Sequence, residues 1–386
     1  MITSHFAHPS YVLACFVLVW TCSCASDREL APDTVSAQHK RVEPSAATTP
    51  GAHDADELVR QATRHYDGDG VRRDPEFAAR LYGRAAQQHD ARAQYALGVM
   101  SEQGDGVPQD DAEAARWYRL AADQGHAPAQ TNLALMYLAG RGVAASDERA
   151  RHWLLAAAEQ GTARAQFCLG LMMTEGRGTP SDDAAAARWL QLAADQGLAV
   201  AQERLAAMYM NGEGVAADAA EACRWLALAA EQGHAPAQLT LALAYSEGRG
   251  VAPDSVRAAS WMRLAAEQGL AMAQHNFGLM CLRGEGVASD PQEAARWLHA
   301  AADQALAVAQ SKLGSMYELG RGVVRDPVAA LMWYRLSAEL GHEPARAQAG
   351  AIAKAMTREQ VTQAEERARA WTSARASVPA PGRRAQ

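Results

Sequence analysis

The sequence predicts an all-α protein, an α/α solenoid of about eight copies of one helix-turn-helix unit. Two residue series carry this prediction, because each advances along the chain in steps of 36 residues without an insertion. The first series is the leading glycine of a Gly-x-Gly sequence, at Gly68, Gly104, Gly140, Gly176, Gly212, Gly248, Gly284 and Gly320. The second series is a tryptophan, at Trp117, Trp153, Trp189, Trp225, Trp261, Trp297 and Trp333. A fixed period of this length is typical of arrays in which each unit packs on its neighbours.

Each unit is expected to hold two helices, as residues 125–160 illustrate. Pro128 suits a first helical turn, where its missing amide hydrogen would have no partner anyway. Leu133, Met136 and Tyr137 then follow at helical spacing. Gly140 is predicted to end this first helix, because glycine adopts the left-handed conformation at low cost.

The second helix of most units is predicted to begin after a capping aspartate. The candidates are Asp74, Asp110, Asp182, Asp218, Asp254, Asp290 and Asp326. Such a side chain can accept a hydrogen bond from an unpaired amide of the first turn. The tryptophan of the second helix is predicted to fill the core, so we expect Trp225→Ala to cost about 3–5 kcal/mol.

The solenoid is predicted to span residues 53–371, with atypical units at both ends. The first unit lacks the Ala-Gln pair of the others and carries Leu81 in place of tryptophan, which indicates an N-terminal cap. Thr357 and Gln360 have capping-box spacing before a charged helix that we interpret as a C-terminal cap. Residues 27–52 and 372–386 lack an apolar period and are predicted to be a flexible linker and a disordered tail.

Residues 1–26 are predicted to be a secretory signal peptide. The apolar run YVLACFVLVW at 11–20 is shorter than the roughly 20 residues that span a membrane, and small residues follow it near Ala25. We therefore expect export to the periplasm or beyond. Cys24 in TCSC offers an alternative, a lipoprotein signal with a lipid anchor in the envelope. Because no Lys or Arg precedes the run, an uncleaved N-terminus inside the cell or a misassigned start stays open.

Composition and motifs argue against several functional classes. The net charge of −7 gives no basic footprint, so we expect no nucleic-acid partner. Cys168, Cys223 and Cys281 have neither disulfide nor zinc spacing and are expected to be buried. The sequence contains no HExxH, GxxxxGK(S/T), GxSxG or SxxK motif, so we predict no catalytic residue, cofactor or metal site. His126 and His234 share one repeat position three units apart, too far for one ion, and are interpreted as solvated.

The stretches AARWYRLAADQGHA (114–127) and AQTNLALMYLAGRGV (129–143) resemble the Sel1-like repeat, a relative of the tetratricopeptide repeat. The resemblance covers about residues 54–371. It implies a right-handed superhelix and a role in binding other proteins. Some Sel1-like proteins have been linked to β-lactam binding, so the alternative is a β-lactam-binding or hydrolase-type enzyme. The missing serine nucleophile makes a monomeric, non-catalytic scaffold the first prediction.

Three positions of the first helix differ freely between units, while its Ala-Gln, Leu and Met/Tyr positions hardly change. Steps of seven and eight residues keep these positions on one helix face. By resemblance to tetratricopeptide arrays, that face lines the concave groove and binds another protein or peptide. The candidate residues are Tyr95, Thr131, Leu138, Arg164, Phe167, Glu175, Glu203, Met210, Leu239, Glu247, His275 and Arg283. A solvated face under weak constraint is the alternative. If the face is open, alanine at Tyr95, Phe167 and Leu239 together should leave the melting profile largely intact.

Overall fold

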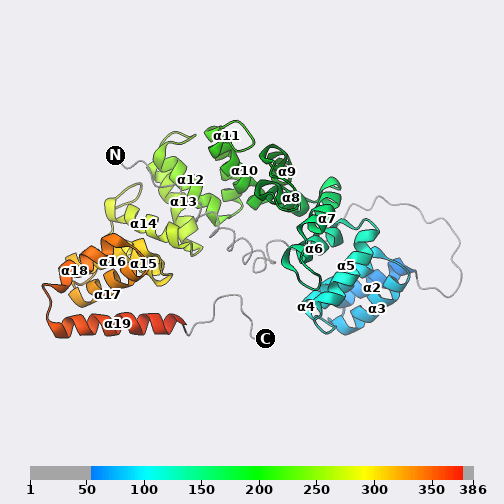
Figure 1. The fold of residues 1–386 in the computed structure, drawn as a ribbon, viewed down its shortest axis with the longest axis horizontal. Coiled ribbons are helices and arrows are strands. Elements are labelled where there is room, and N and C mark those ends of the chain that lie inside the picture. Colours follow the sequence, from blue (N-terminus) through cyan, green and yellow to red (C-terminus); the bar gives the residue numbers. More distant parts are fainter. Residues whose placement is uncertain (1–53, 377–386) are drawn as a thin grey trace. The chain divides into compact units, whose positions relative to one another are not determined.

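The computed structural model describes residues 54–376, and the predictions for residues 1–26, for the linker 27–52 and for residues 377–386 lie outside this range. The chain divides into two compact units: residues 51–361, and a unit that includes residues 362–376. Within the described range every regular element is an α-helix, as Figure 1 shows, so the predicted all-α solenoid is confirmed. No helix in residues 54–376 combines the length and apolar character that a membrane span requires.

The first helices of the successive units are called the A helices. They are α2 (Ala55–Asp67), α4 (Ala91–Gln103), α6 (Ala127–Ala139), α8 (Ala163–Glu175), α10 (Ala199–Asn211), α12 (Ala235–Glu247), α14 (Ala271–Arg283), α16 (Ala307–Leu319) and α18 (Glu343–Ala353). The second helices are called the B helices. They are α3 (Pro75–Gln87), α5 (Asp111–Asp123), α7 (Asp147–Glu159), α9 (Asp183–Asp195), α11 (Ala219–Glu231), α13 (Ser255–Glu267), α15 (Pro291–Asp303) and α17 (Pro327–Glu339). Each A helix packs on the B helix of its own unit, and each B helix packs on the next A helix.

The helix ends follow from the residues that the repeat keeps. All seven predicted aspartates cap their B helices, for example Asp110, whose carboxylate accepts from the amides of Ala112 at 2.8 Å and Glu113 at 3.0 Å. Ser146 takes this place in the unit without an aspartate. Gly140 ends α6 in the left-handed conformation, with a φ of +66°.

The second glycine of each Gly-x-Gly sequence allows a close approach between neighbouring units. Gly142 has a φ of +64°, and a Cβ atom built there would lie 2.0 Å from the carbonyl oxygen of Asp111. The turn therefore sits directly on the first turn of the preceding B helix. An L-residue would have to break that contact as well as adopt a strained φ.

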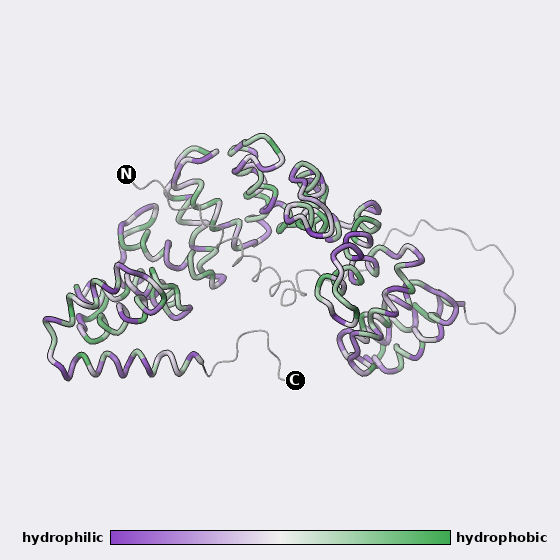
Figure 2. The backbone as a smooth tube through the Cα atoms, viewed as in Figure 1, coloured by the Kyte–Doolittle hydropathy of each residue, from purple (hydrophilic) through white to green (hydrophobic). Residues whose placement is uncertain are grey.

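The core is built from small residues and from the residue that follows each tryptophan. Ala121 and Ala122 are almost fully buried, which confirms that small residues let the helices approach. The large buried side chains at the position after the tryptophan are Tyr118, Leu154, Leu190, Leu226, Met262, Leu298 and Tyr334. Figure 2 shows apolar and polar residues interleaved along the helices, as expected for elements that are buried on one side.

The tryptophans themselves lie at the edge of this core, which corrects the prediction that they fill it. Trp225 is half-buried and packs against the core clusters of two neighbouring units. Trp333 is the exception, with only 3 % of its surface exposed. The next residue along the helix points more directly at the A helix, so it takes the central place in the core.

The last described helix is α19 (Arg358–Ala376). Its capping box is present in both directions: the amide of Thr357 donates to Gln360 Oε1 at 3.0 Å, and the amide of Gln360 donates to Thr357 Oγ1 at 3.2 Å. The helix continues into residues 372–376, which corrects the predicted start of a disordered tail at 372. Thr372 Oγ1 donates to the carbonyl of Ala368 at 3.1 Å, and the Arg375 guanidinium lies 5.0 Å from the centre of the Trp371 ring. The role of α19 as a cap of the solenoid stays a prediction.

Candidate functional site

The A helices of neighbouring units come within side-chain reach of one another, so their variable positions form a connected surface. Tyr66 Oη donates to Gln103 Oε1 at 3.4 Å, and Ser311 Oγ donates to Gln348 Oε1 at 3.0 Å. Both bonds join A helices 37 residues apart in the chain. We call the surface formed by the predicted binding residues and their equivalents on the A helices the variable face.

One part of the variable face is less open than the sequence suggests. Tyr95 is half-buried, with its ring 5.8 Å from that of Tyr118 and 4.9 Å from that of His126. Phe167 is half-buried against the core cluster formed by α9 and α10. Thr131 is buried and donates its hydroxyl to the carbonyl of Ala127 at 3.0 Å. Alanine at Tyr95, Phe167 and Leu239 would therefore remove packing, which corrects the expectation of an unchanged melting profile.

The outer part of the face is exposed and carries charge. Glu175, Glu247 and Arg283 end their A helices and are exposed, while Leu138 and Met210 are half-buried one position earlier. Arg164 is half-buried at the start of α8. Exposed charged residues next to half-buried apolar residues give this part of the face the mixed polar and apolar character of a protein-binding surface.

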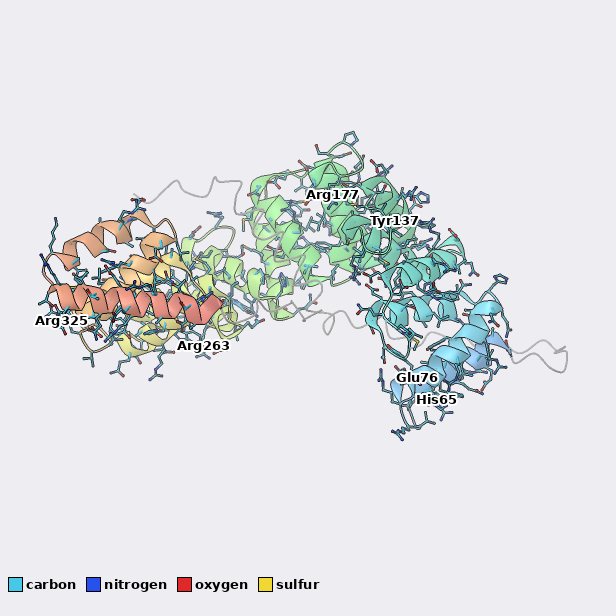
Figure 3. The ribbon with its side chains drawn as sticks, turned by 60° about the horizontal axis from the view of Figure 1, so that its bottom comes forward. His65, Glu76, Tyr137, Arg177, Arg263 and Arg325 are labelled. Atoms are coloured by element: carbon cyan, nitrogen blue, oxygen red, sulfur yellow. The ribbon has the colours of Figure 1, made fainter. Side chains whose placement is uncertain are left out.

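The face around α8 and α10 carries both acidic and basic groups. Burial raises the pKa of Glu203, which is half-buried. Partial burial also raises the pKa of Glu175, against the opposing effect of Arg177 and Arg204. Arg177, labelled in Figure 3, is held away by Asp147, to which it donates through Nε at 3.1 Å and through Nη2 at 2.6 Å. The charge of Arg204 opposes the shift in the pKa of Glu203, but the two side chains form no ion pair.

Basic groups dominate the face around α14 and α16. Burial, together with the charges of Lys312 and Arg283, lowers the pKa of His275 to about 4, so its imidazole is neutral at pH 7. Lys312 was not among the sequence candidates. Its signal in the sequence was present, since its position varies between units as Ala96, Asn132, Cys168, Arg204, Thr240 and Asn276.

Repeated glutamine side chains link the A helices to the B helices, and we call these bonds the glutamine ladder. The ladder was not among the features predicted from the sequence. Gln130 Nε2 donates to the carbonyl of Ala122 at 3.1 Å, and Gln130 Oε1 accepts from Gln160 Nε2 at 2.8 Å. The same bonds recur at Gln166, Gln202, Gln238 and Gln274. The signal was the second glutamine, which also repeats every 36 residues, from Gln124 to Gln304. The ladder fixes the A helices relative to the B helices.

The histidines of the repeat corners are half-buried rather than solvated. His126 is the N-cap of α6, and its Nδ1 accepts from the amide of Ala129 at 3.3 Å. Burial lowers its pKa. Among residues 54–376, no group of three or more His, Cys, Asp or Glu is arranged to hold a metal ion. Burial raises the pKa of the Cys168 thiol, which makes that side chain a poor nucleophile.

Comparison with known proteins places this repeat in a family. The Sel1 repeat model matches eight times, at residues 62–90, 91–126, 127–162, 163–198, 199–234, 235–270, 271–306 and 307–342. A search of the curated proteins finds no match.

Two solved structures are similar over most of the chain. A Sel1 repeat protein from Oxalobacter formigenes is 30% identical, with a TM-score of 0.62, and the match covers 90% of this chain and 94% of that one. The c5321 protein of uropathogenic Escherichia coli, described as a protective antigen with an SLR fold, is 29% identical with a TM-score of 0.44, and the match covers 86% and 89%. The eight matched repeats and the similarity to the Oxalobacter formigenes protein show that the chain belongs to the Sel1 repeat family.

Proposed function

We propose that this protein is an exported, monomeric scaffold that holds another protein against the concave side of its solenoid, with the variable face as the contact surface. The Sel1 repeat fold is a type of protein–protein interaction scaffold. The observation that carries the proposal is the contrast between a repeated framework and a face that changes in every unit. The capping aspartates and the glutamine ladder recur, whereas the outer positions carry Glu175, Glu247 and Arg283.

An extended peptide or a helix from the partner suits this face. The A helices present side chains at regular intervals, and a linear segment can contact several units in succession. No observation on residues 54–376 favours the alternative of a β-lactam-binding or hydrolase-type enzyme. Export, by cleavage of residues 1–26 or by lipidation of Cys24, would place the scaffold in the cell envelope or outside it.

The test is a selection of random twelve-residue peptides, displayed on phage, against the immobilised full chain. The selected peptides are then measured against a charge-reversed variant, Glu175→Arg with Glu247→Arg. The control is Glu159→Arg with Glu231→Arg, two exposed glutamates on B helices that change the net charge equally. Melting curves confirm that both variants fold.

We expect the selected peptides to bind the control like the original chain, and those among them that carry Lys or Arg to bind the A-helix variant at least tenfold more weakly. The reason is that reversed charges on the variable face repel groups that the original charges attract. A selection that enriches no peptide, or one in which every enriched peptide binds both variants equally, would contradict the proposal.

A further inference from the structure

Three positive side chains gather where the A helices α14 and α16 face each other. Lys312 lies on α16, Arg283 ends α14, and Arg321 lies in the turn after α16. Lys312 is half-buried, and its pKa is lowered by burial first and then by the positive charges of Arg283 and Arg321. Both arginines are therefore close enough to Lys312 to repel its charge, and Arg321 reaches the backbone beside Arg283, at the carbonyl of Leu282.

Within residues 54–376, the one carboxylate paired with the cluster is that of Glu285, which contacts Arg283 only. Lys312 forms no ion pair with any residue in 54–376. Arg283 Nη1 lies 3.5 Å from Glu285 Oε1, a long contact between exposed groups. Arg321 Nη2 donates to the carbonyl of Leu282 at 2.9 Å, which leaves its charge uncompensated.

The acidic residue of α16 is already engaged elsewhere. Glu318 accepts a hydrogen bond from Tyr334 Oη at 2.7 Å, which directs its carboxylate towards α17. His275 adds an unpaired polar atom beside the cluster, because its Nδ1 is buried and has no hydrogen-bond partner. Its low pKa keeps it neutral, so it offers a hydrogen bond rather than a fourth charge.

The repeat itself does not require these residues. At the position of Arg283 the other units carry Gln103, Ala139, Glu175, Asn211, Glu247 and Leu319. Holding a half-buried lysine beside two arginines costs folding free energy, because burial and like charges both disfavour its charged form. A carboxylate from a binding partner would offset that cost, since it removes the repulsion and completes the missing ion pair.

We propose that the surface of α14 and α16 binds an acidic peptide segment of the partner, with its carboxylates paired to Lys312, Arg283 and Arg321. This inference rests on the proposed function and adds the chemistry of the bound segment. A peptide fits better than a nucleic acid, because the chain carries a net charge of −7 and the cluster is local rather than a stripe along the solenoid.

The test uses the same phage selection, run in parallel on the original full chain, on Lys312→Gln and on Lys354→Gln. Lys354 lies at the end of α18 and is exposed, so its loss changes the net charge equally outside the cluster. Selected peptides are synthesised with glutamate and aspartate intact or replaced by glutamine and asparagine, and binding is measured by fluorescence anisotropy. Vesicles containing phosphatidylglycerol serve as a second probe.

We expect a class of selected peptides that is enriched in Asp and Glu. These peptides should bind Lys312→Gln at least tenfold more weakly and Lys354→Gln as strongly as the original chain. Replacing their Glu and Asp by Gln and Asn should weaken binding to the original chain at least tenfold. Peptides that depend on Glu175 and Glu247 without acidic enrichment would overturn this inference and leave the proposed function standing. The absence of any enriched peptide would overturn both. Vesicle binding that Lys312→Gln abolishes, without acidic peptides, would assign the cluster to an anionic lipid surface instead.

Discussion

Two glycines of the A helices lie directly against aromatic rings of the B helices. A Cβ built on Gly98 would lie 2.5 Å from Tyr118 Cδ1, and one built on Gly314 would lie 2.8 Å from Tyr334 Cδ1. Where the A helix carries alanine instead, as at Ala206, the facing residue is aliphatic. Gly170 and Gly278 face Leu190 and Leu298, so in the units that carry the tryptophan a tyrosine is always paired with glycine, whereas an aliphatic residue is paired with glycine or alanine.

Gly314→Ala is expected to destabilise the protein by about 1–3 kcal/mol, because the new methyl group overpacks the site against Tyr334. Adding Tyr334→Leu should recover part of the loss, since Ala206 faces Leu226 without strain. Chemical denaturation of the single and double variants measures this coupling. Gly350→Ala is the control, because nothing lies within 4 Å of its Cβ position and helix propensity alone should stabilise it slightly. Strictly additive effects of the two changes at 314 and 334 would contradict the account.

The glutamine ladder stops one unit early, at Gln310. Gln310 Oε1 is buried without a partner, because Leu340 stands where the other units have the donating glutamine. Leu340 is 52% exposed, and its backbone angles of −84° and 11° match those of Gln304 at −85° and 11°. A glutamine at position 340 can therefore adopt the geometry of the other units.

Leu340→Gln is expected to stabilise the chain by about 0.5–1.5 kcal/mol, since it supplies the missing donor and removes an exposed apolar side chain. The opposite change within the ladder, Gln268→Leu, should destabilise by about 1–3 kcal/mol, because it leaves Gln238 Oε1 unpaired. Thermal melts of both variants test the ladder. If Leu340→Gln leaves the stability unchanged or lowers it, the missing hydrogen bond to Gln310 Oε1 does not limit stability.

At the scale of the element, the tryptophan of the B helix is buried to different extents in different units and should contribute differently to stability. Trp333 is buried, so Trp333→Ala should cost about 3–5 kcal/mol. Trp225 is half-buried and its Nε1 has no partner, so Trp225→Ala should cost about 2 kcal/mol, less than full burial would give. Denaturation midpoints of the two variants provide the comparison. An equal loss in both would place Trp225 inside the core after all.

The helices and their ends were predictable because local chemistry sets them. Asp110 and its equivalents cap helices by bonds within three residues, and Gly140 ends one through its own backbone angle. The burial of Trp225 was not predictable, because a residue and its successor differ by about 100° around the helix and both can face the core. Only the packing of the next unit decides between Trp225 and Leu226.

The location of the candidate site was predictable from the sequence, but the burial of its residues was not. Variation between units identified the A-helix face, including the exposed Glu175, Glu247 and Arg283. Variation cannot distinguish an open position from one where neighbouring units pack, which is why Tyr95 was expected to be open and is half-buried. Lys312 was missed because the sequence does not show that its side chain lies near Arg283 of the preceding unit.

At the scale of the whole molecule, the repeated framework of capping aspartates and glutamine ladder stabilises the array, and the variable face is proposed to bind the partner. Each unit is stabilised mainly by its neighbours, so a change at an exposed outer position costs little stability. Residues such as Glu247 can therefore vary with the partner while the capping aspartates and the ladder keep the array intact. We propose that partner binding belongs to the variable face alone and leaves the framework unchanged.

Site-specific photo-crosslinking in living cells tests that claim most directly. A photoreactive amino acid replaces Glu175 or Glu247 on the variable face, and Glu159 or Glu231 on the B helices, in the full chain. We predict adducts with the same partner protein from positions 175 and 247 and none from positions 159 and 231. Adducts confined to positions 159 and 231, or no adduct at positions 175 and 247, would contradict a role of the variable face in partner binding.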